Sequence, residues 1–239
     1  MKRFYRVSVA LIATAALSAC GGGGDSEAGS TTSYAVGTAW ANLYDGGARS
    51  WSLSGTTTFQ AAGGGSASYA TTASLALTPL ADAHFPANDV NAHVLQSSTS
   101  VSLAGSTSTS TSSWYLDANL LYMGSVDSDG YCEVASQPTP PAAYATIGNS
   151  GSLASYQLYD SCSAGATLVG TGTLRWSLEL QNGQPFFCMN SQTDYVSSGS
   201  YTEKDCVAID VNGTIGSQAS ITATDISTDG VGTLSLRSN

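Results

Sequence analysis

The stretch TLVGTGTLRWSLELQNGQPFFCMNSQ, residues 167–192, decides the fold class. Apolar and polar residues alternate from Leu174 to Leu180, which places every second side chain on the same face of an extended strand. Asn182-Gly183 separates this run from another over residues 185–192, and an Asn-Gly pair between two such runs is typical of a type I′ hairpin turn. The stretch therefore predicts two adjacent antiparallel strands.

Runs of the same character recur along the chain. They are rich in Thr, Val and aromatic residues with two-residue periodicity, and no helical stripe accompanies them. The expected strands are residues 34–44, 51–60, 67–77, 90–103, 109–122, 131–134, 152–159, 167–180, 185–192, 201–211, 218–226 and 231–237. The sequence predicts an all-β fold, an antiparallel sandwich or a barrel-like architecture, with no helix beyond a signal peptide.

A proline-rich segment divides the pattern. Pro138-Thr139-Pro140-Pro141 cannot supply a continuous ladder of backbone donors, so we expect a linker over residues 137–143 between one β-unit at 34–136 and another at 144–239. Asp229-Gly230 marks a further hairpin in the second unit.

The two units resemble each other in sequence. Residues 43–58 and 158–173 are identical at seven of 16 positions without a gap, and Asp117-Ala118-Asn119 is echoed by Asp210-Val211-Asn212. Biased composition also produces chance matches. A duplication would let two similar β-units bury their apolar faces against each other.

The chain begins as an exported protein does. Three cations precede an apolar run over residues 7–17 that is shorter than the roughly 20 residues a membrane-spanning helix needs, which indicates a signal peptide over residues 1–19. Leu17-Ser18-Ala19-Cys20 resembles the lipobox of bacterial lipoproteins. An uncleaved anchor and ordinary cleavage after Ala19 are the alternatives.

The resemblance to lipoproteins implies that Cys20 carries acyl chains such as palmitate, and several chains together hold a protein stably on a membrane. Gly21 stands where an aspartate would imply retention in the inner membrane, so the outer membrane of a Gram-negative bacterium is implied, with a periplasmic or a surface orientation open. Residues 20–33 form the expected lipidated, Gly-rich flexible tether.

Removal of residues 1–19 leaves four cations against 17 acids, a net charge of −13. A surface that binds phosphates needs clustered Lys or Arg, so the composition argues against nucleic acid as a partner.

The mature chain keeps four cysteines, an even number that predicts two disulfides in an exported protein. Cys188 and Cys206 lie nearly symmetrically about Ser197-Ser198 in an expected hairpin, which favours their pairing and leaves Cys132 with Cys162. The other two connectivities remain open. A zinc site is disfavoured because no cysteine pair has the close spacing of zinc ligands.

No motif for a cofactor or a catalytic nucleophile is present, and the sequence predicts no cofactor and no metal. Asp127, Asp129 and Glu133 partly resemble a calcium loop but lack its full ligand spacing, so an acidic hairpin turn is favoured. His84 and His93 lie in an expected loop, where Asp82 and Asp89 could complete a metal pair with them only as a weak alternative.

Carboxylate catalysis is harder to exclude. Glu133, Glu179 and Glu203 are the candidates for a glycosidase pair, although nothing beyond residue type supports them. The four tryptophans could stack on sugar rings or fill the core, and the core is favoured in a domain with few large apolar residues.

The domain outline also resembles Gram-negative envelope lipoproteins of no assigned activity. Residues 115–119 and 209–213 carry that likeness. The leading hypothesis is a non-enzymatic outer-membrane lipoprotein that binds or scaffolds an envelope protein or glycan. A carbohydrate-active or envelope-remodelling enzyme and a surface adhesin-like module are the alternatives.

Overall fold

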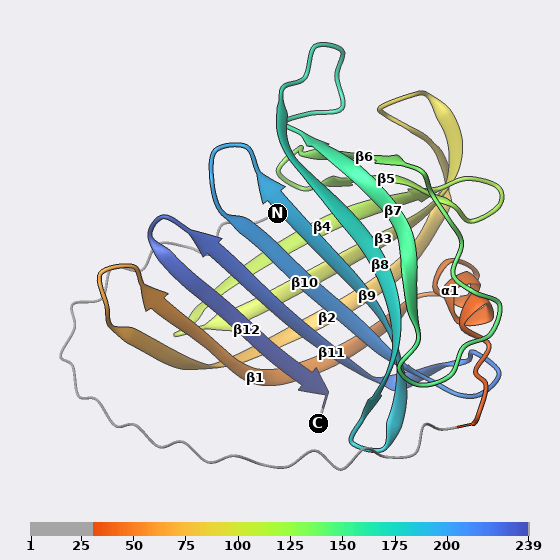
Figure 1. The fold of residues 1–239 in the computed structure, drawn as a ribbon, viewed down its shortest axis with the longest axis horizontal. Helices are drawn as coiled ribbons and strands as arrows, with labels where there is room; N and C mark the ends of the chain where they lie inside the picture. Colours follow the sequence, from red (N-terminus) through yellow and green to blue (C-terminus); the bar gives the residue numbers. More distant parts are fainter. Residues whose placement is uncertain (1–30, 239) are drawn as a thin grey trace.

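A computed structural model describes residues 31–238 as twelve antiparallel strands closed into one barrel, with a single helix inside it (Figure 1). The strands follow one another around the barrel in chain order, and β12 closes it by pairing with β1. The elements are α1 (Val36–Asp45), β1 (Arg49–Ala61), β2 (Ser66–Phe85), β3 (Val90–Leu103), β4 (Ser106–Leu116), β5 (Tyr122–Asp127), β6 (Cys132–Ser136), β7 (Ser150–Tyr159), β8 (Leu168–Gln181), β9 (Gln184–Tyr195), β10 (Ser200–Ile209), β11 (Ile215–Ser227) and β12 (Gly230–Ser238).

The all-β class is confirmed, and a closed barrel resolves the choice between sandwich and barrel. The expectation of no helix beyond the signal peptide is wrong, since α1 is present, and two of the expected strands are wrong as well. Residues 34–44 were expected to be a strand but include most of helix α1, and the expected strand over residues 109–122 is divided by the turn between β4 and β5.

Alternation of side chains defines the inside and the outside of the barrel. Trp51, Leu53 and Thr57 of β1 are buried, whereas the residues between them are exposed or half-buried. Leu234 and Leu236 of β12 continue the same inner face. Most outward positions of β1 and β2 are Ser or Thr, so an apolar lining faces a polar outer surface, as the two-residue period requires.

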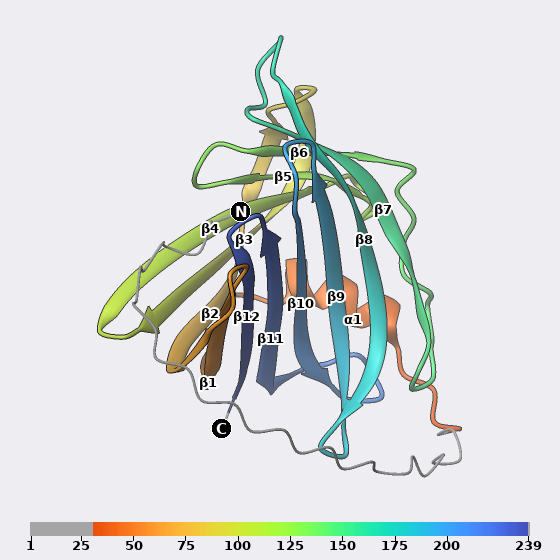
Figure 2. The ribbon, with the colours of Figure 1, turned by 60° about the vertical axis from the view of Figure 1, so that its left-hand side comes forward.

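Helix α1 fills one end of the barrel. Its buried residues, Val36, Ala39, Trp40, Leu43 and Tyr44, recur at helical spacing and pack in the same core cluster as the inward side chains of the strands. Figure 2 shows the helix crossing the interior behind β8, β9 and β10. The Trp40 Nε1–H group donates to the Leu120 carbonyl oxygen at 2.9 Å, which ties the helix to the turn between β4 and β5.

Further hydrogen bonds fix the helix and the residues before it to two more loops. The Ala35 N–H donates to the Val211 carbonyl oxygen at 3.1 Å, and the Asn42 side-chain amide donates to the Gly213 carbonyl oxygen at 2.9 Å. Gly213 has a positive φ of 80°, and a Cβ there would clash with the backbone at Ala35 and Ala39. Tyr34 pairs with Ala145 across the end of the barrel. The helix therefore seals this end.

The hairpin predictions are confirmed with one change in detail. Asn182 and Gly183 both have positive φ values, 51° and 79°, as a type I′ turn requires. The β11–β12 hairpin is also present, but Ser227 pairs with Gly230, so its two turn residues are one position earlier than the Asp-Gly motif.

The internal sequence match maps onto the structure in two different ways. The block at 43–58 covers the end of α1 and most of β1, while its counterpart at 158–173 covers the end of β7 and the start of β8, so a helix is aligned with a strand. By contrast, Asp117 and Asp210 make equivalent turns, each carboxylate accepting two backbone N–H groups, after β4 and β10. These turns lie six strands apart, and the proline segment likewise separates β1–β6 from β7–β12.

None of the helical structure in residues 31–238 is long and apolar enough to cross a bilayer.

Two tyrosines in the interior allow a stability prediction. The Tyr44 hydroxyl is buried without a hydrogen-bond partner, whereas the Tyr156 hydroxyl bonds to the Gln192 carbonyl oxygen at 3.0 Å and to Thr193 Oγ1 at 2.7 Å. Tyr44→Phe should raise the free energy of unfolding by about 1 kcal/mol, and Tyr156→Phe should lower it by about 1 to 2 kcal/mol. Chemical denaturation of both variants measures this, and loss of stability in Tyr44→Phe would contradict it.

Candidate ligand-binding lumen

The half of the barrel away from α1 contains a cavity of about 1360 Å³. No residue of α1 lines it, and its rim includes the hairpins β1–β2, β3–β4, β5–β6 and β11–β12. In an up-and-down barrel these hairpins lie at the end opposite the β4–β5 and β10–β11 turns that hold the helix. We call this cavity the lumen. It is open at the rim and has an apolar floor above the helix.

Hydroxyl groups and aromatic rings form much of the wall. Ser97 and Thr99 of β3 face the lumen beside Ser108, Ser110 and Ser112 of β4. The aromatic rings on the wall include two edge-to-face pairs, Phe59 with Tyr69 at 6.3 Å and Trp114 with Tyr122 at 5.7 Å between ring centroids. Such a wall offers both flat apolar surface and hydrogen-bond partners.

The charged groups of the lumen are all acidic. Within the described chain, no Lys, Arg or His side chain lines it. The carboxyl groups that do are Asp127, Asp129, Glu133, Glu203, Asp205, Asp225 and Asp229. They extend from the hairpin residues Asp129 and Asp229 at the rim to Asp205, whose cross-strand neighbours are Met189 and Ile221. The lumen is therefore lined by acidic groups along its depth.

Two of the deeper carboxyl groups accept hydrogen bonds from tyrosines. The Tyr122 hydroxyl donates to Glu133 Oε2 at 2.7 Å, and the Tyr201 hydroxyl donates to Glu203 Oε2 at 3.0 Å. Burial raises the pKa of both glutamates, and the tyrosine hydrogen bonds offset part of that rise.

Asp205 differs from these two glutamates. It follows Glu203 on the same face of β10, yet its Oδ1 atom is buried without a hydrogen-bond partner. Burial raises the pKa of Asp205 well above its ordinary value, and the nearby Glu203 carboxylate raises it further. The structure holds this carboxyl group in an environment that disfavours its charge.

The residues singled out for calcium, Asp127, Asp129 and Glu133, all line the lumen. Asp127 Oδ1 accepts the backbone N–H groups of Asp129 at 3.0 Å and Tyr131 at 2.9 Å, so it stabilises the β5–β6 hairpin. This is the acidic turn that the sequence favours. Cys20, the proposed lipidation site, lies outside the described residues.

Both expected disulfides are present, Cys132–Cys162 and Cys188–Cys206. Cys188 and Cys206 are direct cross-strand partners on β9 and β10. Their bond lies on the outer face, behind the part of β10 that carries Glu203 and Asp205 into the lumen.

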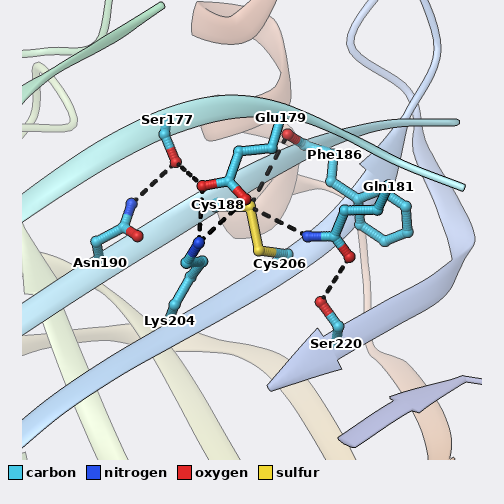
Figure 3. The surroundings of a disulfide bond; sticks show 9 residues. All are labelled: Ser177, Glu179, Gln181, Phe186, Cys188, Asn190, Lys204, Cys206 and Ser220. Carbon is cyan, nitrogen blue, oxygen red and sulfur yellow. Dashed lines mark hydrogen bonds and ion pairs between the residues drawn. A yellow bond between two sulfur atoms is a disulfide. The ribbon is translucent and has the colours of Figure 1, made fainter. Parts of the chain in front are cut away.

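Polar side chains surround this disulfide (Figure 3). Lys204 pairs with Glu179 at 2.9 Å, and Gln181 Nε2 lies 3.9 Å from Cys188 Sγ while its Oε1 accepts from Ser220 at 3.0 Å. Glu179 is therefore a surface ion-pair partner and does not join Glu133 and Glu203 in the lumen.

Metal-ligating side chains converge at one place in residues 31–238. Glu179, Cys188 and Cys206 have ligand atoms within 4.8 Å of one another, but both cysteines are in the disulfide and offer no thiolate. The loop expected for His84 and His93 is wrong, since His84 lies on β2 and His93 on β3. They pair with Asp89 and Asp82 at 3.0 and 2.9 Å and do not line the lumen.

Sequence reasoning identified Glu133 and Glu203 as candidate carboxylates but missed Asp205. The available signal was the alternation Tyr201, Glu203, Asp205, which places all three on one face of a strand. The strand continues inward with Val207 and Ile209, so that face is the core side. A carboxyl group on the core side of a strand is the unusual feature that could have indicated the lumen.

Comparison of the chain with protein-family models, with curated proteins and with solved structures finds no match.

The pKa shifts predict opposite responses for two aspartates close together in sequence. Because the folded pKa of Asp205 is raised, its contribution to stability is complete below the unfolded pKa of about 4 and is lost as the pH rises toward and through the folded pKa. Backbone hydrogen bonds from Thr214 lower the pKa of exposed Asp210, so its contribution is present above about pH 4 and is lost as the pH falls.

Asp205→Asn should therefore gain stability over wild type by about 1 to 3 kcal/mol between about pH 4 and pH 8, because a carboxyl group with a buried, unpartnered oxygen is removed. The matched variant Asp210→Asn should lose stability at neutral pH and approach wild type in acid. Thermal unfolding across this pH range measures both. An unchanged pH profile in Asp205→Asn would show that Asp205 is not strained by its surroundings.

Proposed function

We propose that this protein is a lipid-anchored envelope protein that binds a small molecule in the lumen of its barrel. The observation that carries the proposal is the cavity of about 1360 Å³, open at one end and closed at the other by a helix packed into the core. Concave sites with an apolar or aromatic wall and a few polar groups are the usual form of small-molecule sites.

The wall composition supports binding rather than simple packing. A core built for stability alone would place apolar side chains at inward positions, yet inward positions of β4 hold Ser108, Ser110 and Ser112. Asp205 places a buried, unpartnered carboxyl oxygen beside the lumen, and such burial is costly to the fold. Its presence is accounted for if it serves a ligand.

The anchoring part of the proposal rests on the lipobox-like sequence ending at Cys20. Acyl chains at Cys20 would hold the protein on the outer membrane of a Gram-negative bacterium, and residues 21–33 would join the lipid to the barrel. Two other proposals are an envelope protein or glycan as partner and an adhesin-like role of the outer surface. The chemically unusual groups face inward, which favours the lumen as the binding site.

One observation favours a second candidate function, carbohydrate hydrolysis. Glu133 and Glu203 line the same aromatic-walled lumen, and burial raises the pKa of both, as a general acid requires. This alternative demands that the protein release reducing sugar from a glycan, and that Glu133→Gln and Glu203→Gln each abolish the release. Binding is preferred because it also accounts for Asp205.

A bulky substitution inside the lumen tests whether a small molecule binds there. Ser191 of β9 faces the lumen next to Glu203, whereas the adjacent Gln192 is exposed on the outer face. We expect the fluorescence of the neutral dye Nile red to rise with wild type and with Gln192→Trp but not with Ser191→Trp, since the indole occupies the site. Equal responses of the two variants would place dye binding outside the lumen and contradict the proposal.

The anchor is tested separately. Cys20→Ala should remove the proposed lipidation site and release the protein from the membrane fraction, and labelled palmitate should enter wild type but not the variant. Ser18→Thr, which keeps the cysteine, is the control. Membrane retention of Cys20→Ala at the wild-type level would contradict lipidation.

A further inference from the structure

The deepest carboxyl groups of the lumen define the chemistry of its ligand. This inference rests on the proposed lumen-binding function and adds to it the class of molecule bound. Seven carboxyl residues and no Lys, Arg or His from the described chain line the cavity. Carboxylates that line a cleft with low-dielectric walls concentrate the electrostatic field there and raise the local concentration of cations. An anionic ligand would find no cationic side chain of the described residues on this wall.

Asp205 marks the place in the lumen where a positively charged group of a ligand would bind. Its Oδ1 atom has no hydrogen-bond partner, its cross-strand neighbours are Met189 and Ile221, and Glu203 is the next residue on the same face. The hydrogen bond from Tyr201 reaches Glu203 and leaves Asp205 without a donor. An ammonium group has three hydrogen-bond donors and a positive charge. It would therefore supply both a donor and a counter-charge to Glu203 and Asp205.

Aromatic rings stand beside these acids. Tyr201 contacts Glu203, while Tyr122 contacts Glu133 and packs edge-to-face on Trp114. The faces of such rings attract organic cations, and their apolar area can pack against the carbon part of a ligand. A carboxyl pair near aromatic walls therefore fits a charged group carried on a carbon chain.

A bare metal ion fits less well. A divalent cation needs several oxygen ligands around one point, but within residues 31–238 no three carboxyl groups of the lumen have ligand atoms within 4.8 Å of one another. The acids are instead spread from rim to floor of a cavity much larger than an ion. Spread charges suit an extended ligand.

We propose that the lumen binds an ammonium-bearing organic cation, with its ammonium group between Glu203 and Asp205 and its carbon chain along the aromatic wall. Glu133 faces the same cavity and supports the positive charge from another strand. Further carboxyl groups toward the rim lie where a second or third ammonium group of a longer amine would reach.

The experiment compares molecules that differ only in charge. Binding of octylamine, octanol, spermidine and calcium chloride to the purified barrel is measured by isothermal titration calorimetry at low ionic strength. Octylamine is expected to bind at least tenfold more tightly than octanol, which has the same chain without the charge, and spermidine more tightly than octylamine. Asp205→Asn should weaken amine binding by about tenfold to a hundredfold, the range for hydrogen bonds to charged groups, and Asp210→Asn should not change it.

The outcomes separate this inference from the proposed function. If octanol binds as well as octylamine, or Asp205→Asn binds amines normally, the cation site is wrong while lumen binding stands. If calcium binds tightly and amines do not, the site is a metal site and the inference is again wrong. If none of these probes binds and Nile red fails as well, the lumen-binding proposal itself is overturned. Glu203→Gln provides a second variant should Asp205→Asn fail to fold.

Discussion

The pairing of β1 with β12 is the constraint on which the rest of the structure depends. Nine residue pairs, from Leu53 with Ser238 to Ala61 with Gly230, join the two ends of the chain of strands (Figure 1). Closure leaves no open sheet edge, and it gives every strand one face toward the interior. Once the barrel is closed, strict alternation decides which side chains lie inside, so the position of Glu203 and Asp205 in the lumen follows from register alone.

A barrel of twelve strands is too wide to be filled by its own side chains. Helix α1 fills one end with Trp40, Leu43 and Tyr44, and the other end remains a cavity. The fold therefore separates two tasks along one axis. The helical end supplies the buried apolar area that stabilises the barrel, which leaves the open end free to hold hydroxyl and carboxyl groups. The disulfide between Cys188 and Cys206 joins β9 to β10, the strand that carries Glu203 and Asp205.

Most of the fold is predictable from sequence because strand alternation and turn chemistry are local. The Asn182-Gly183 turn and the residue range of β3 agree with the sequence prediction, and so do both disulfides. Helix α1 was missed because its ten residues include Gly37 and Thr38, lack a side-chain N-cap, and owe their stability to the barrel around them. Local propensity does not report such tertiary support.

The site was predictable only in part, because it also depends on tertiary contacts that the local sequence does not report. Glu133 and Glu203 lie on strands that are separated by more than sixty residues, and they face one lumen only because the barrel is closed. The residue type alone gives no sign of that shared lumen. Predicting Asp205 also requires knowing that the strand face with Val207 and Ile209 points inward. The pairing register of the strands supplies this information, and the composition does not.

The free-energy cost of burying the Asp205 carboxyl group links ligand binding to the stability of the fold. A ligand that binds the folded barrel and not the unfolded chain stabilises it in proportion to the logarithm of its concentration. An ammonium group beside Asp205 would also favour the ionised carboxylate, and so reverse the direction in which burial moves the pKa of this residue. The barrel by itself therefore keeps an unfavourable group at the boundary between its apolar floor and its polar lumen. A cation of the right shape turns that group into a favourable contact, whereas a neutral molecule of the same shape leaves the unfavourable burial in place.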